Sequence, residues 1–257
     1  MADKPIRIIT RGADSGSCRS VNRAHLDAFQ NGMMRNTSLM IPAPAFEEAV
    51  EMFKDLPGLC VGSHGAITDE WNEVRWGPVL GPEKVPSLVM DDGTFYKTTQ
   101  ELWANKPDFN EIAAELKAQI DLARSCGVKV DYLDGHMGYR WFDGLAEVLD
   151  ELCEKEGILR GEHVNRQCER LSQVSLDVAD PIEELVARLE ATEPGKTYLM
   201  VTHPGYDDDE LKAMTYGDNP PGEIARQRNW QRLMFMDPRV VECFERKGIE
   251  AIRYTEF

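Results

Sequence analysis

Residues 109–136 read FNEIAAELKAQIDLARSCGVKVDYLDGH, and this stretch contains the repeating unit of the fold. From 109 to 125 the apolar residues Ile112, Leu116 and Ile120 recur at every fourth position, which predicts a helix with one buried face. The next run, 128–133, is short and rich in β-branched and aromatic residues, which predicts a strand. A helix that leads into such a strand is half of a βαβ unit, the building block of parallel sheets.

The same alternation runs along the whole chain. Strands are predicted at 6–10, 37–41, 59–63, 128–133, 157–160, 197–202 and 249–253, and helices at 20–30, 45–53, 109–125, 145–155, 182–190 and within 208–247. About seven strand–helix units in this length favour a (β/α) barrel over an open doubly wound sheet. No internal repeat or linker divides the sequence, so we predict a single α/β domain over 1–257 with a long insertion loop at about 66–107.

Composition narrows the class of protein. Of the 257 residues, 42% are hydrophobic, 29 are Lys or Arg and 45 are Asp or Glu, which gives a formal net charge of −16. This excludes a disordered chain and argues against nucleic acid or an anionic membrane as a partner, since both require a basic surface. No run of 18 apolar residues is present, which predicts that no helix spans a membrane. Six cysteines without a C-x-x-C pair, and a first segment without a secretory signal, predict free thiols and a cytoplasmic location.

Polar side chains that bind metals follow several of the predicted strands. Asp14, His64 and His203 each come at or shortly after the end of a strand, and Asp134 and His136 follow a fourth. Because the carboxyl ends of parallel strands meet at one edge, we expect these side chains to converge. One aspartate with two or three histidines is typical of a catalytic site for a divalent cation such as Zn²⁺. The alternative is that each histidine is a hydrogen-bonded loop residue.

Four segments carry a resemblance to a known family. They are TRGADSGSCRSVNRA at 10–24, VGSHGAIT at 61–68, YLDGHMGYR at 132–140 and VTHPGYDDDEL at 201–211. In this order they resemble the YdjC-like carbohydrate deacetylases, which include chitooligosaccharide deacetylases. The resemblance implies an irregular (β/α) barrel of the polysaccharide-deacetylase kind. It also implies a hydrolase that removes an N-acetyl group from an amino sugar with the help of a divalent metal ion; the family is often assigned Mg²⁺, whereas the ligands here suggest Zn²⁺.

The resemblance also implies roles for individual residues. Asp14, His64 and His136 match the metal ligands of the family, and His203 matches a general acid that protonates the leaving amine. The family's general base, however, is replaced here by Ala13, which cannot accept a proton. A general base contributes about 10²–10⁴-fold to the rate.

Two hypotheses follow from the alanine. The chain is either an active deacetylase or a catalytically silent protein that binds metal or sugar on the same scaffold. In the first case Asp134 could take the role of the base, although the sequence favours the alternative that it orients a ligand imidazole.

Four further residues are candidates for substrate binding. Arg11, Arg140 and Arg160 could make the site locally positive and favour an anionic substrate, unless each is paired with a surface acid. Trp76, in the insertion loop, is the best candidate for stacking on a sugar ring, unless it anchors that loop to the barrel. The expected partner is a small N-acetylated carbohydrate. The sequence is compatible with a monomer and with a homodimer.

Overall fold

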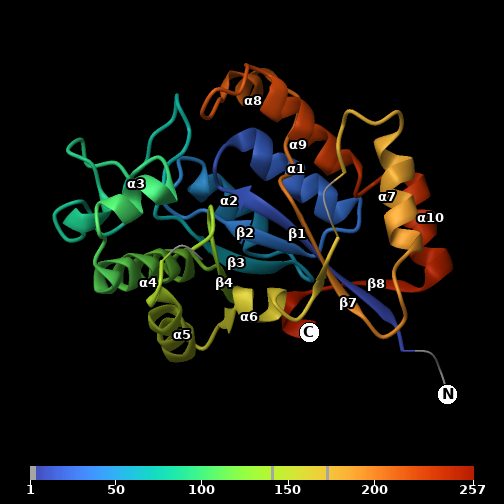
Figure 1. Ribbon diagram of the computed structural model, residues 1–257, viewed down its shortest axis with the longest axis horizontal. Coiled ribbons are helices and arrows are strands. Elements are labelled where there is room, and N and C mark those ends of the chain that lie inside the picture. The colour runs from blue at the N-terminus through green and yellow to red at the C-terminus, as the bar shows by residue number, and fades with distance from the viewer. Residues whose placement is uncertain (1–3, 140–141, 172–173) are drawn as a thin grey trace.

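A curled parallel sheet forms the centre of the computed structural model, which describes residues 4–139, 142–171 and 174–257. Seven strands follow one another in the order β5-β4-β3-β2-β1-β7-β6, and β8 pairs with β1 (Figure 1). The strands are β1 (Ile6–Ser15), β2 (Asn36–Leu39), β3 (Cys60–Gly65), β4 (Tyr132–Gly135), β5 (Leu159–Arg160), β6 (Glu169–Arg170), β7 (Thr197–Thr202) and β8 (Ile249–Ile252).

Strand β1 occupies the middle of the sheet because its apolar sequence can be buried on both sides. Its first half, Ile6–Ile9, pairs with β8, and its second half pairs with β2, while β7 lies along the opposite edge. Ile8 and Ile9 are completely buried. The side chain of Asn36 joins β8 to β2, since its amide donates to the carbonyl oxygen of Ile252 at 2.9 Å and accepts from the backbone of Tyr254.

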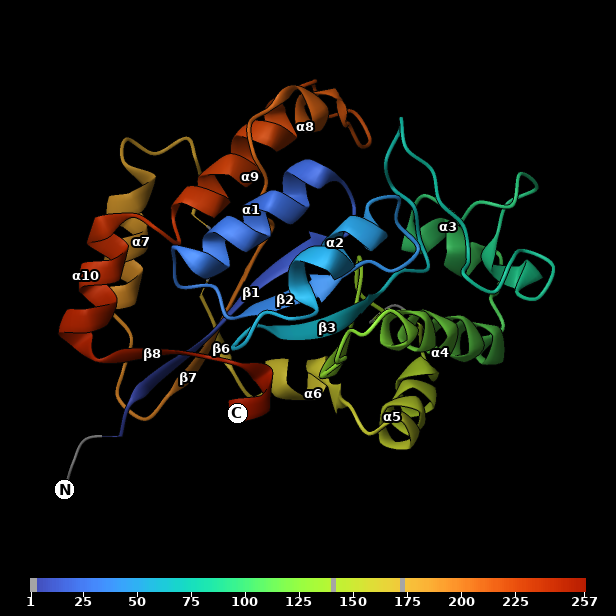
Figure 2. The same cartoon turned by 180° about the vertical axis from the view of Figure 1, so that it is seen from behind.

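Helices surround the sheet. Figures 1 and 2 show α1, α8 and α9 together on one side, α4 beside α5, and α7 beside α10, in agreement with their contacts. The helices are α1 (Arg19–Gln30), α2 (Phe46–Phe53), α3 (Thr99–Ala104), α4 (Phe109–Ser125), α5 (Leu145–Glu156), α6 (Gly161–Asn165), α7 (Pro181–Glu190), α8 (Asp209–Ala213), α9 (Glu223–Leu233) and α10 (Pro238–Lys247). No helix in the described ranges is long and apolar enough to cross a membrane.

The prediction of an irregular (β/α) barrel is confirmed. The sheet is a half-barrel, because within the described residues β5 and β6 each pair on one side only. Two short elements, β6 and α6, were missed, since a strand of two residues and a helix of five carry almost no periodic signal.

The predicted insertion between β3 and α4 is packed against the body of the protein. Trp71, Trp76 and Phe95 are buried in one apolar cluster with residues of α4 and α5. The insertion also contains the helix α3, where an irregular loop was predicted. This helix begins with a capping box formed by Thr98 and Glu101.

Candidate metal centre and active site

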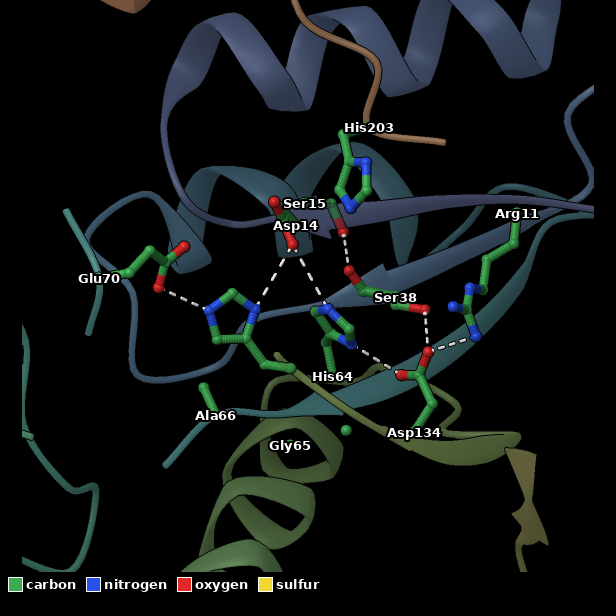
Figure 3. Close-up of polar contacts among 12 residues, drawn as sticks. Arg11, Asp14, Ser15, Ser38, His64, Gly65, Ala66, Glu70, Asp134 and His203 are labelled. Carbon is green, nitrogen blue, oxygen red and sulfur yellow. Dashed lines mark hydrogen bonds and ion pairs between the residues drawn. The ribbon is translucent and has the colours of Figure 1, made fainter. Parts of the chain in front are cut away.

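Five polar side chains meet at one edge of the sheet, where β1, β3, β4 and β7 end. They are Asp14, His64, Asp134, His136 and His203, and Figure 3 shows how four of them lie relative to one another. All except Asp134 line a cavity of about 440 Å³. The structure therefore brings together the residues that the strand-end pattern predicted.

Three of these side chains have the spacing of a metal site. Oδ1 of Asp14 lies 3.3 Å from Nε2 of His64 and 3.5 Å from Nδ1 of His136. One ligand atom from each of the three residues lies within 4.8 Å of the others, and all three residues are buried. Two imidazole nitrogens and one carboxylate oxygen suit a borderline divalent cation and leave coordination positions open.

Each of the two histidines also forms a hydrogen bond to a further carboxylate, through the ring nitrogen that does not face Asp14. Nδ1 of His64 donates to Oδ1 of Asp134 at 2.9 Å, and Nε2 of His136 donates to Oε2 of Glu70 at 2.7 Å (Figure 3). Such contacts fix the ring and its tautomer, and they are typical of metal-bound histidines. They leave Nε2 of His64 and Nδ1 of His136 to face Asp14, so the donor set fits a metal ion.

The cluster favours positive charge at its centre. Burial alone would lower the pKa of His136, but Glu70 and Asp14 outweigh burial and raise that pKa to about 10. Burial alone would raise the pKa of Asp14, but the charge of Arg228 and the hydrogen bonds from His136 and His64 hold it well below its usual range. The negative field around the two imidazoles therefore stabilises a proton or a cation there.

Asp14 occupies an unusual place in the backbone. Its φ angle is 71°, in the left-handed region, and the pairing of β1 with β2 shifts register between Gly12 and Ser15. A bulge of this kind re-aims a side chain at the end of a strand. The other carboxylate oxygen, Oδ2, pairs with Nη2 of Arg228 at 2.7 Å.

Asp134 is occupied on both of its oxygens. Oδ2 lies 2.5 Å from Nη1 of Arg11 and accepts from Oγ of Ser38 at 3.1 Å, while Oδ1 accepts from His64. Burial alone would raise the pKa of Asp134, but the charges of Arg11 and His64 lower it to about 2. This environment is that of a carboxylate that orients a ligand, and a group with this pKa is a poor proton acceptor.

His203 lies on the opposite side of Asp14 from His64 (Figure 3). Its backbone N–H donates to the side chain of Gln231 on α9 at 2.5 Å. Burial lowers the pKa of His203 to about 4; Asp14 opposes this shift and Arg228 adds to it. The imidazole is therefore neutral at neutral pH and can accept a proton.

The glycine of the HPGY segment lets α9 approach the site. The backbone N–H of Gly205 donates to the carbonyl oxygen of Arg228 at 3.1 Å. A Cβ atom at position 205 would lie 2.9 Å from Cβ of Arg228 and 2.5 Å from the side chain of Leu211. This close contact places Arg228 and Gln231 beside His203.

Comparison with known proteins agrees with this architecture. The sequence model of the YdjC-like proteins matches residues 7–246. The chain belongs to the YdjC-like family. Its relatives include a carbohydrate deacetylase of Geobacillus stearothermophilus, 27% identical over 98% of both chains, and one of Thermoanaerobacter pseudethanolicus, 28% identical over 96% of this chain and 98% of that one.

A crystal structure from Enterococcus faecalis V583 has the same fold. That protein, named for an inferred role in cellobiose-phosphate cleavage, superimposes with a TM-score of 0.79 at 23% sequence identity and covers 98% of this chain and 99% of its own. At this identity the likeness concerns the fold alone.

Two of the residues predicted to bind substrate in this YdjC-like protein do not line the cavity. Trp76 is buried in the apolar cluster, where its Nε1 donates to the carbonyl oxygen of Thr68 at 3.1 Å, and it does not line the cavity. Arg160 is paired with Asp150 and Glu162, also outside the cavity. The structure therefore does not bring either side chain to the cavity, because each has nearer partners.

The other two arginines differ. Arg11 does line the cavity, but its guanidinium is held by Asp134 and by the hydroxyl of Tyr254 at 2.9 Å, so its charge is already balanced. Arg140 lies outside the described residues.

Several cavity residues were missed by the sequence analysis. Glu70 and Trp71 come from the insertion, Arg228 and Gln231 come from α9, and Tyr216 comes from the loop between α8 and α9. Trp71 and Tyr216 form an antiparallel bridge, and their rings meet edge to face at 6.3 Å. These residues follow no strand, so the strand-end rule could not find them.

Proposed function

We propose that this YdjC-like protein is a metal-dependent hydrolase that removes the acetyl group from the nitrogen of an N-acetylated carbohydrate. The observation that carries the proposal is the cluster of Asp14, His64 and His136, in which Asp134 and Glu70 hold the outer nitrogens of the histidines. The names of the curated relatives support the class of substrate.

The cluster would hold one divalent cation. Two nitrogen donors and one oxygen donor favour Zn²⁺, and Mg²⁺ is the alternative. A bound cation would polarise the acetyl carbonyl group and make the attacking water more acidic. The protein then has to bind the sugar, exclude bulk water and move one proton from the water to the nitrogen.

His203 is the best candidate for this proton transfer. Ala13 has no acidic side chain, and Asp134 is held by Arg11, Ser38 and His64. The neutral imidazole of His203 can accept the proton that the water loses as its oxygen bonds to the acetyl carbon. The same proton then passes to the nitrogen as the C–N bond breaks, giving acetate and a free amine. One histidine would thus act first as base and then as acid.

Acetate release tests the proposal directly. Metal-loaded protein is incubated with N-acetylglucosamine and with short chitooligosaccharides, and acetate and free amine are both quantified. We expect equal amounts of the two products, loss of turnover after chelation, and recovery on addition of Zn²⁺ or Mg²⁺. If elemental analysis confirms bound metal and no N-acetylated sugar, neutral or anionic, releases acetate, the proposal is wrong.

A further inference from the structure

Two side chains of the cavity carry buried hydrogen-bond donors without an acceptor. Nη2 of Arg228 is bound to Asp14, but its Nη1 has no partner among the described residues. Nε1 of Trp71 likewise has no hydrogen-bond acceptor among the residues that the structure describes. The two groups are neighbours, since the guanidinium carbon of Arg228 lies 5.2 Å from the centre of the Trp71 ring.

Unpaired buried donors are costly, because each has lost its water without gaining an acceptor. Trp71 is 1% exposed, and the side chain of Arg228 is 11% exposed. Both residues line the cavity that contains Asp14 and His203. Two such donors on neighbouring side chains, one of them cationic, are suited to an acceptor-rich anionic group.

The charges around the cavity point the same way. With the histidines neutral, as metal binding requires, Asp14, Glu70 and Asp134 contribute three negative charges and Arg11 and Arg228 contribute two positive ones, which leaves −1. A divalent cation in the metal site changes this sum to +1. The loaded cavity therefore attracts an anion although the whole chain carries −16.

We propose that the N-acylated substrate carries a carboxylate or a phosphate group, and that Arg228 and Trp71 bind it. This inference rests on the proposed function and narrows it from N-acetylated carbohydrates in general to anionic ones. Arg228 and Trp71 thereby take the role of binding an anionic substrate, which the sequence suggested for Arg11, Arg140 and Arg160. A neutral sugar fills the same cavity but brings no anionic acceptor to Nη1 of Arg228.

Matched ligands separate the anion from the sugar. Isothermal titration calorimetry on Zn²⁺-loaded protein compares N-acetylglucosamine with N-acetylmuramate, which adds a carboxylate, and with N-acetylglucosamine 6-phosphate, which adds a phosphate. We expect at least one anionic ligand to bind about tenfold more tightly than the neutral sugar, with an advantage that shrinks as salt is raised. The ligand that gains affinity identifies the anionic group.

Variants test the two residues. Trp71→Phe keeps the ring but removes the N–H, and Arg228→Lys keeps the charge that pairs with Asp14 but removes the second nitrogen. Each should bring the ratio of anionic to neutral affinity close to one, and this ratio is the readout whatever the substitution does to the affinity for N-acetylglucosamine. Arg226→Gln, in the same helix but exposed and paired with Glu223, is the control and should change neither. Metal content is measured in every variant, so that a lost cation is not mistaken for a lost contact.

Two results would overturn the inference. One is equal affinity for neutral and anionic ligands; the other is an anionic advantage that survives in both cavity variants. Acetate release from N-acetylglucosamine in the same preparations would then leave the proposed deacetylation intact. Conversely, tight binding of an anionic sugar without any acetate release would support this site and reject the proposed reaction.

Discussion

Nδ1 of His64 donates a hydrogen bond to Oδ1 of Asp134 over 2.9 Å, deep beneath the cavity. The bond leaves Nε2 of the same ring to face Asp14. We infer from this bond that Asp134 is a positioning residue rather than the general base.

Replacing Asp134 by asparagine should weaken metal binding about 10–100-fold, because the imidazole loses the carboxylate that orients it. Competition with a chromophoric chelator measures the affinity. Asp131→Asn, close by in the chain and paired with Lys129 outside the cavity, is the matched control. Unchanged metal affinity together with lost turnover would instead identify Asp134 as the proton acceptor.

Removing either ligand histidine should remove the metal. His64→Ala and His136→Ala each leave two ligands where three are present, so we expect stoichiometric metal in the parent and almost none in the variants after gel filtration. His163→Ala removes an exposed histidine paired with Asp150 and should retain full occupancy. Full occupancy in both cavity variants would show that the cation binds elsewhere.

Ala13→Asp restores a carboxylate on the cavity wall. If proton transfer limits the present chain, acetate release should rise by about 10²–10⁴-fold, the usual contribution of a general base. Metal content should not change, since Asp14, His64 and His136 all remain. Ala13→Ser, similar in size but a poor base, is the control. An unchanged rate in the aspartate variant would mean that His203 alone suffices.

The pH profile reports on His203. Its pKa is lowered to about 4, so the imidazole is neutral above that pH and becomes charged below it. A proton acceptor must be neutral, and kcat/KM should therefore stay level from pH 7 down to about pH 5 and then fall as the ring is protonated near pH 4. His203→Gln should retain metal and lose this acidic limb along with most turnover. Metal content measured at each pH distinguishes this limb from loss of the cation.

Gly205→Ala tests how closely α9 packs. The added Cβ would lie 2.5 Å from the side chain of Leu211 and 2.9 Å from Cβ of Arg228, so α9 or α8 must shift. We expect the free energy of unfolding to fall by about 1–3 kcal/mol, as in other overpacked sites. Urea denaturation measures it. An unchanged unfolding midpoint and slope would mean that the contact is not rigid.

The sequence was informative where chemistry follows a strand. Asp14, His64, His136 and His203 could be found because parallel strands bring their carboxyl ends together, whatever the details of packing. Trp71 and Trp76 are only five positions apart in a segment without periodicity, and nothing in the sequence indicates which of the two side chains lines the cavity. Arg11 lines the cavity, as expected, but its partner Asp134 lies more than a hundred residues away, so its neutralisation was not visible.

The residues of this site come from two sources in the chain. The strand ends supply Asp14, His64, His136 and His203, whereas the insertion and α9 supply Trp71 and Arg228. Strand ends are fixed by the sheet, but an insertion and a covering helix can change without disturbing it. Proteins built on one scaffold can thus come to bind different acylated compounds through changes in these outer segments, while the residues at the strand ends, which act on the acyl bond, stay the same.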